Sequence, residues 1–220
     1  MNRFLIAVVI LLCVCQGCKK ENNSSVPATP DNTSEIVATC DDGDNLSKTY
    51  SQNEANDFSE YSFSGVAGTY FGYRSTFNFN EKAKIDISFG TILTADGALS
   101  NADVLKLIAP GEKAFGSLGS YTSYPKLLPN RVEIAYTDKK SQKWCSTMIT
   151  EKQTSWGIDT QTEIRQEGSS FVIDKVASIQ LTTGQGYRIQ GHFECQLYEL
   201  NGRHNKKIKG SFSGVISVRA

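Results

Sequence analysis

The chain has 220 residues, in which 23 Lys and Arg residues balance 23 Asp and Glu residues. This balance excludes the basic surface that nucleic-acid binding needs, and it leaves no acidic surplus to attract a cationic partner. We therefore expect no nucleic-acid partner, and function has to be inferred from the motifs along the chain.

The first eighteen residues have the features of an export signal. Arg3 precedes an unbroken apolar run, Phe4–Cys15. This run is too short to cross a bilayer core, which needs about 20 residues, but it matches the apolar region of a signal peptide. An ordinary secretory signal cut elsewhere, or a short membrane anchor, is the alternative interpretation.

The end of this run identifies a lipidation site. Gly17 stands directly before Cys18, whereas bulkier Val and Leu stand before Cys15 and Cys13. The pattern resembles the lipobox of bacterial lipoproteins, in which a small residue precedes the modified cysteine. We predict that residues 1–18 are a lipoprotein signal ending at lipidated Cys18. The protein would then contact the membrane through its N-terminal lipid, in the cell envelope and most simply at the outer membrane.

A polar segment follows the signal. Residues 19–39 are rich in Asn, Ser, Thr and Pro and contain no aromatic residue. Such a segment buries too little apolar surface to offset its ordering entropy. We therefore predict a tether and start of the domain over residues 19–57. The nearby Asp41–Asn45 run lacks the spacing of a calcium loop, and it is interpreted as a polar turn.

From residue 58 to residue 220 the pattern predicts a single β-rich domain. Lys84–Phe89, Arg131–Tyr136 and Ser170–Leu181 alternate apolar and polar residues, as strands with one buried face do. One helix is expected over Ser100–Ala109, with Ser100 or Asn101 as its cap. The expected fold is therefore an antiparallel β-sandwich or barrel with one short helix.

The last two strands form the clearest hairpin. Odd positions of Tyr187–Leu197 and even positions of Ile208–Val218 carry the apolar residues, so these two sets share one face. A tight turn at Asn201-Gly202 and a wider loop from Asn201 to Lys206 both satisfy this facing. The facing is thus predicted, while the register stays open between the two turns.

Four strand and turn segments are similar to a group of uncharacterised lipoproteins of the Bacteroidota: Tyr136–Ser146, Ser169–Ile173, Gly191–Tyr198 and Gly210–Gly214. The turn between Asp138 and Trp144 lacks the glycine that such proteins usually have there. The resemblance implies an envelope-anchored β-sandwich, and it implies no known activity.

Three cysteines remain once the signal and the lipidated residue are set aside. An exported protein can form disulfides, but three thiols cannot all pair within one chain. A Cys145–Cys195 bridge between strands is one pairing, and Cys40 joined to either of them is another. A buried, inert thiol is the alternative for Cys195, which lies on the apolar face of its strand.

Motifs for catalysis, metals and cofactors are absent from the sequence. His192 and Glu194 share the polar face of one strand, but no third ligand lies nearby in sequence, so solvated side chains are the favoured interpretation. The basic run Arg203–Lys209 is interpreted as a solvated loop. We therefore predict no enzyme activity, no metal site and no cofactor.

A binding role is the sharper hypothesis for function. The loop Gly116–Pro125 places Tyr121 and Tyr124 among small polar residues, a composition that suits a glycan or a peptide. A second aromatic group, Tyr70–Tyr73 with Phe77 and Phe79, is more simply explained by core packing. The alternative to ligand binding is an assembly subunit that docks to another envelope protein through a sheet edge or this loop.

Overall fold

The structure is a computed structural model in which Asn32–Ala220 forms one compact unit. It describes residues 33–50, 58–65, 68–93, 100–116, 118, 129–147, 149–154, 157–163, 166–181, 184–199 and 204–218. Residues 1–32, including the predicted lipidation site Cys18, lie outside the described residues. Within the described part of the chain, no helix is long and apolar enough to cross a membrane.

Strands make up most of the described chain, and the all-β prediction is confirmed. The elements are β1 Ser34–Cys40, β2 Asn45–Tyr50, β3 Ser59–Gly65, β4 Gly68–Asn78, β5 Lys84–Leu93, α2 Asn101–Ile108, β6 Gly111–Glu112, β7 Ala114–Phe115, β8 Arg131–Thr137, β9 Lys143–Cys145, β10 Ile149–Thr154, β11 Gly157–Glu163, β12 Ser170–Leu181, β13 Gly184–Glu199 and β14 Asn205–Ser217.

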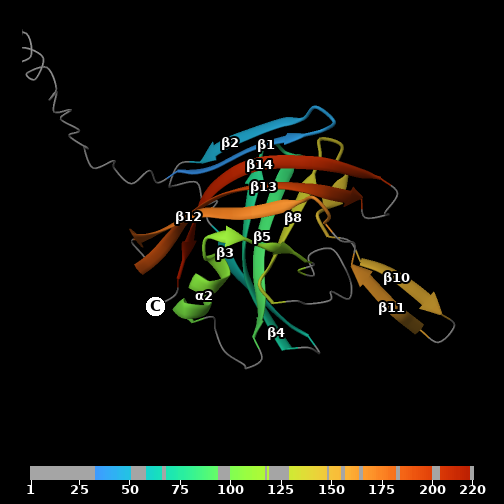
Figure 1. Cartoon of the computed structure of the whole chain (residues 1–220). Coiled ribbons are helices and arrows are strands. Elements are labelled where there is room, and N and C mark those ends of the chain that lie inside the picture. The colour runs from blue at the N-terminus through green and yellow to red at the C-terminus, as the bar shows by residue number, and fades with distance from the viewer. Residues whose placement is uncertain are drawn as a thin grey trace, which may run out of the picture. The chain divides into compact units, whose positions relative to one another are not determined.

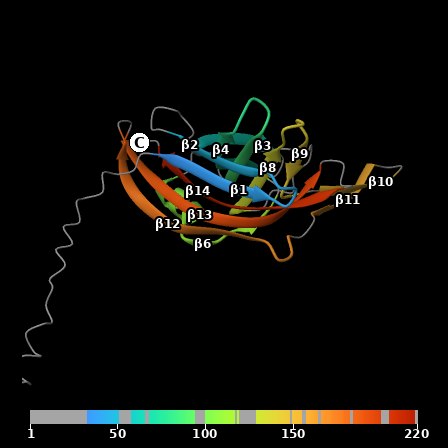
Figure 2. The ribbon, with the colours of Figure 1, turned by 90° about the horizontal axis from the view of Figure 1, so that it is seen from above.

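One large, almost entirely antiparallel sheet dominates the fold. Its main path runs β2-β1-β14-β13-β9-β8-β5-β4-β3, with β12 on β13, β6 on β12 and β7 on β8. Along β13, the partner on one side is β12 up to Glu194 and β9 from Tyr198. The sheet curls, so that β1, β12, β13 and β14 cross over β3, β4, β5 and β8 (Figures 1 and 2). A separate hairpin joins β10 to β11.

The domain begins earlier than the sequence indicates. The sequence predicts a tether and the start of the domain over residues 19–57, whereas the structure places β1 and β2 of this range in the sheet. Ile36 lies opposite Phe212 of β14, and the even-numbered β1 residues are buried. A short alternating strand in a polar neighbourhood was therefore missed, because Ile36, Ala38 and Cys40 contribute too little hydrophobicity to mark it.

The β13–β14 hairpin settles the register that the sequence left open. Tyr198 lies opposite Asn205 and Tyr187 opposite Ile216, which is the register of the tight turn at Asn201-Gly202. Phe212 lies opposite Gly191 in this register. A Cβ atom on Gly191 would come within 2.8 Å of the Phe212 ring, so the glycine gives this ring its space.

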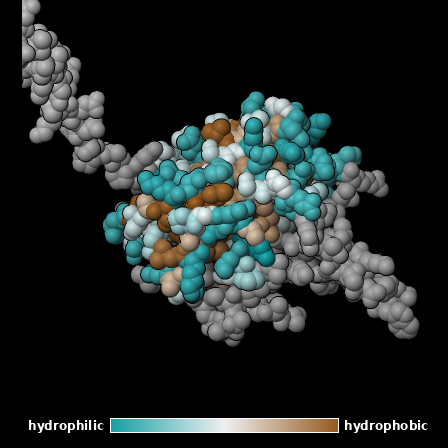
Figure 3. All heavy atoms as spheres, in the orientation of Figure 1, coloured by the Kyte–Doolittle hydropathy of each residue, from teal (hydrophilic) through white to brown (hydrophobic). Residues whose placement is uncertain are grey.

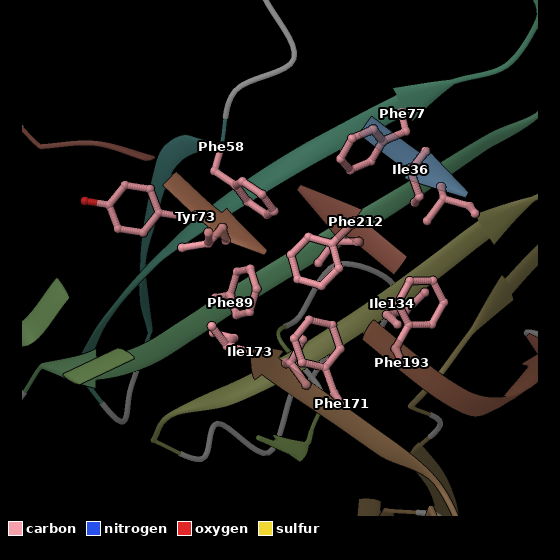
Figure 4. Packing of buried hydrophobic residues seen from close by; sticks show 14 of the residues in the cluster. Ile36, Phe58, Tyr73, Phe77, Phe89, Ile134, Phe171, Ile173, Phe193 and Phe212 are labelled. Atoms are coloured by element: carbon pink, nitrogen blue, oxygen red, sulfur yellow. The ribbon is translucent and has the colours of Figure 1, made fainter. Parts of the chain in front are cut away.

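Phenylalanine rings fill the space between the crossing parts of the sheet (Figure 4). The ring centroids of Phe171 lie 5.4 Å from Phe89 and 5.3 Å from Phe212, and Phe58 lies 5.3 Å from Phe89. These side chains are at most 4% exposed. Offset and edge-on ring pairs of this kind add to the free energy gained by burying apolar surface.

Helix α2 closes one side of this core. Ser100 is its N-cap: the hydroxyl accepts a hydrogen bond from the Asp103 backbone N–H, and the Asp103 carboxylate accepts one from the Ser100 backbone N–H. The predicted helix and its cap are thus confirmed. Val104, Leu107 and Ile108 are buried, which fixes the helix to the rest of the domain.

Candidate functional site

Two hollows lie side by side on the face of β1, β12, β13 and β14 that points away from the core. Their volumes are about 330 and 500 Å³, and they share Thr39, Glu194 and Lys209. We call this surface the outer groove. Its outward side chains come from four strands: Val37 and Thr39, Lys207, Lys209 and Ser211, His192 and Glu194, and Ser170.

Strand alternation and register set the outer groove. One row across the sheet runs Ser170–Glu194–Lys209–Thr39, and the next row runs Val172–His192–Ser211–Val37. Each of these residues neighbours a core residue in sequence, so the pattern that buries one face necessarily presents this set on the other. Val37, at 43% exposure, supplies an apolar contact among hydroxyl and charged groups.

An irregularity in β12 adds a member to this surface. The pairing of β12 with β13 shifts between Ile173 and Lys175, which leaves Asp174 as an extra residue. The Asp174 carboxylate Oδ2 lies 2.8 Å from His192 Nδ1. Asp174 thereby orients the His192 ring. Because both side chains are about half exposed, their pairing contributes little to stability.

The outer groove presents groups that can form hydrogen bonds. Ser211 lies opposite His192, whose Nδ1 contacts Asp174. Burial raises the pKa of the Cys40 thiol, at one end of the groove, to about 12, which keeps it protonated. No group of three metal-ligating residues occurs within the described ranges.

The predicted loop residues Tyr121 and Tyr124 lie outside the described residues. The chain enters that loop next to β8, where the backbone N–H of Leu118 donates to Glu133 Oε2 at 3.0 Å. The Thr147 hydroxyl donates to the same oxygen at 2.9 Å. Glu133 lies on the face of β8 opposite the core residues Val132 and Ile134.

The second aromatic group, Tyr70–Tyr73 with Phe77 and Phe79, is explained by packing, as the sequence predicts. Tyr73 and Phe77 are in the core cluster, and Phe79 packs against it. Tyr70 is buried on the opposite face of β4, with its ring lying over Gly90. The core-packing interpretation is therefore confirmed for these residues.

The three domain cysteines are free and buried. The Cys145–Cys195 bridge considered from the sequence is not formed. Cys145 lies opposite Tyr198 of β13, and Tyr198 is three positions after Cys195, so alternation turns the two cysteine side chains to opposite faces. Burial raises the pKa of the thiol in both residues. Cys40 is not bridged either: Ile208 of β14 lies between it and Cys195.

Acidic and aromatic side chains surround the Lys206 ammonium at the end of the sheet where β1 is followed by β2, and we call this group the Lys206 cluster. The Lys206 ammonium lies 2.7 Å from Asp42 Oδ2, 4.0 Å from the centroid of the Trp144 ring and 5.3 Å from that of Tyr136. Its side chain is only 9% exposed. The solvated-loop interpretation of the basic run is therefore wrong for Lys206, because its neighbours form a partly buried cage that sequence distance concealed.

The neighbouring acidic run is a polar turn, as predicted. Gly43 adopts φ = 90° and donates its N–H to the Cys40 carbonyl, which closes the turn. Asp44 accepts hydrogen bonds from Lys139 and Tyr136, at 2.7 and 2.9 Å. The carboxylates at this end of the sheet are thus engaged by the protein's own donors.

Sequence reasoning missed Lys209 and Asp174 as members of a site. Lys209 required the register of β14 against both β1 and β13, and Asp174 required the position of a bulge. The alternation of His192 and Glu194 was the one signal available from the sequence, and it correctly placed both side chains on an outer sheet face.

No protein family matches this chain, and comparisons with curated proteins and with solved structures also find no match.

Proposed function

We propose that this chain is a lipid-anchored cell-envelope protein that binds a glycan or peptide chain in the outer groove, without catalysing a reaction. The observation that supports it most directly is the groove itself, which is open and presents hydroxyl, carboxylate, ammonium and imidazole groups from four adjacent strands. Such mixed groups suit a polar chain that must be held at several points.

The dimensions of the outer groove favour an extended ligand. Neighbouring strands lie about 4.8 Å apart, so four strands span about 14 Å. Glu194 and Lys209 stand opposite each other in the middle of this span, and Val37 offers an apolar contact beside them. A linear ligand with both donors and acceptors would meet a complementary group at each strand.

The anchor rests on the first eighteen residues. The single positive charge, the apolar run of export length and the Gly17-Cys18 pair support attachment through a lipid on Cys18. The outer membrane is the location we propose. The resemblance to envelope lipoproteins of the Bacteroidota supports the same assignment.

One observation favours the alternative, an assembly subunit. Within the described part of the chain, β2 pairs only with β1, so its other edge offers backbone donors and acceptors to a partner strand. Lys48 stands on this edge, and lysine is a residue that discourages such pairing. We therefore place ligand binding first.

Arrays of glycans and of peptides test the proposal with the mature chain. We expect a hit that weakens at least tenfold in a His192→Ala/Lys209→Ala variant, since both side chains are exposed and neither supports the core. Glu81→Ala/Lys82→Ala, in the exposed turn between β4 and β5, is the control and should bind like the original chain. Tyr121→Ala/Tyr124→Ala tests the loop predicted from sequence.

Two results would argue against binding in the outer groove. Arrays without a hit would argue against a glycan or peptide ligand. Equal binding by the groove variant and the control variant would argue against the outer groove as the binding site. Recovery of one envelope protein in pull-downs from solubilised membranes, lost when the β2 edge is blocked by Ser47→Pro, would instead support the assembly role.

A further inference from the structure

The tip of the β12–β13 hairpin is an uncharged segment. Val176–Tyr187 contains no Asp, Glu, Lys, Arg or His, although 21% of the whole chain is charged. We call the described residues of this range, 176–181 and 184–187, the tip segment. Figure 1 shows the ends of β12 and β13 extending beyond the crossing part of the sheet. A projecting hairpin in water would ordinarily carry charged residues, so their absence needs an explanation.

The tip segment also presents apolar residues outward. Beyond the Asp174 bulge, Ile179 lies opposite Gly186 and Leu181 opposite Gly184, so Ala177, Ile179 and Leu181 lie on the outer face. All three are partly exposed. The end of the Leu181 side chain lies over Gly186, where a Cβ atom would come within 2.6 Å of it. Hydrophobic residues gather over this part of β12 and β13 in Figure 3.

The tip segment lies beside the point where the chain enters the domain. Arg188, the next residue along β13, donates from Nη1 to the Thr33 carbonyl at 2.6 Å. Val218, at the end of β14, donates its backbone N–H to the Gln185 carbonyl. Residues 19–32 separate Thr33 from Cys18, and that length of chain reaches at most about 50 Å. A lipid on Cys18 would therefore hold Thr33, and the tip segment beside it, within about 50 Å of the membrane.

We propose that the tip segment rests on the surface of the membrane that holds the lipid anchor, with Ile179 and Leu181 in the headgroup region. This inference rests on the proposed lipid at Cys18 and is independent of the ligand of the outer groove. A few aliphatic side chains bind a bilayer weakly alone, but attachment through the lipid makes the contact intramolecular and raises its effective concentration.

The charges around the tip segment fit this orientation. Lys175 is exposed directly behind it, where it can meet anionic headgroups. Arg188 also stands behind it, and its guanidinium donates to the Thr33 carbonyl. Among the described residues, exposed Glu35 lies in the row that contains Lys175, and Asp174 lies one residue before it. The uncharged segment would thus contact the lipid first, with Arg188 and then the row of Lys175 and Glu35 behind it.

Depth-dependent fluorescence quenching tests this contact in the full lipidated chain. Bimane is attached at Ala177→Cys, which shares the outer face with Ile179 and Leu181, or at Lys140→Cys in the control. Lys140 is exposed in a turn that Lys139 joins to Asp44, at the other end of β1 from Thr33. The three buried thiols remain unlabelled in the folded protein. The vesicles contain phosphatidylcholine and phosphatidylglycerol, with a doxyl quencher on the acyl chain.

We expect at least threefold more quenching at residue 177 than at residue 140, and equal quenching would overturn the inference. Ile179→Ser/Leu181→Ser, made in the Ala177→Cys chain, should abolish this difference while leaving the melting temperature within a few degrees. A difference that survives those substitutions, or one that appears only at high protein density because a second copy covers the tip, would also overturn it.

Vesicle flotation separates failure of the anchor from failure of the tip contact. A chain that floats with the vesicles but shows no quenching difference refutes the tip contact alone. A chain that does not float refutes both the anchor and the contact that depends on it. Neither result changes the array measurements, which report only on the outer groove.

Discussion

Replacing Lys206 by Met tests which interactions stabilise the Lys206 cluster. Methionine keeps the apolar stem and removes the charge. The ammonium lies 4.0 Å from the Trp144 ring centroid in a site where the Lys206 side chain is 9% exposed, so the lost cation–π contact should cost about 1 to 2 kcal/mol. Asp42 is 41% exposed, and water screens its ion pair, which should contribute less than about 1 kcal/mol.

The expected result is a free energy of unfolding lowered by about 2 kcal/mol in Lys206→Met, the sum of these two contributions. Asp138 changes little, because it lies 3.9 Å from the ammonium and already accepts hydrogen bonds from the backbone N–H groups of Lys140 and Gln142. Urea unfolding followed by far-UV circular dichroism measures the change without relying on tryptophan fluorescence.

Double-mutant cycles decide which partner dominates. Lys206→Met combined with Trp144→Leu should show a coupling of about 1 to 2 kcal/mol, and Lys206→Met combined with Asp42→Asn a smaller one. A neutral Lys206→Met variant would refute the reasoning. So would a larger coupling to Asp42, because it would mean that solvent does not screen that pair.

Three further predictions concern packing, thiols and acid stability. In Gly90→Ala the new Cβ would lie 1.6 Å from the Tyr70 hydroxyl oxygen, so we expect a loss of at least about 3 kcal/mol in urea unfolding; an unchanged midpoint would contradict the packing. Asp44 has a pKa below its ordinary value because Lys139 and Tyr136 donate hydrogen bonds to its carboxylate. Its contribution is therefore present above that ordinary pKa and lost as the pH falls through the lowered one, so the stability advantage over Asp44→Asn should shrink below about pH 4; a constant advantage would be inconsistent with this. Maleimide should label no domain thiol in the folded chain and all three in urea, and a product formed under native conditions would show that one is accessible: Cys40, Cys145 or Cys195.

Local alternation was enough to predict much of the fold. The expected strand Ser170–Leu181 has the bounds of β12, and the facing of β13 and β14 follows from their apolar positions. These features depend on neighbouring residues and on the requirement that paired strands share a buried face. The β1 strand was missed because it is stabilised by pairing with β14, about 175 residues away in sequence, rather than by its own hydrophobicity.

The site required information that local patterns do not contain. The row Ser170–Glu194–Lys209–Thr39 combines residues from four strands, and only the sheet order brings them together. The Lys206 cluster likewise joins β14, the hairpin of β8 and β9, and the turn after β1, which are distant in the chain. An Arg203–Lys209 run has the same composition whether its lysines are solvated or caged, so burial could be learned only from the structure.

The bulge at Asp174 links the two surfaces for which we propose roles. Before it, the outward residues of β12 are Ser170 and Val172, next to Glu194 and His192 of the outer groove. The extra residue reverses the alternation, so the outward residues after it are Ala177, Ile179 and Leu181 of the tip segment. One strand therefore presents a polar groove and an apolar tip on the same face. Without the bulge, alternation would turn these three residues to the other face of β12. Ser178 and Gln180, which are exposed to solvent, occupy that face at present.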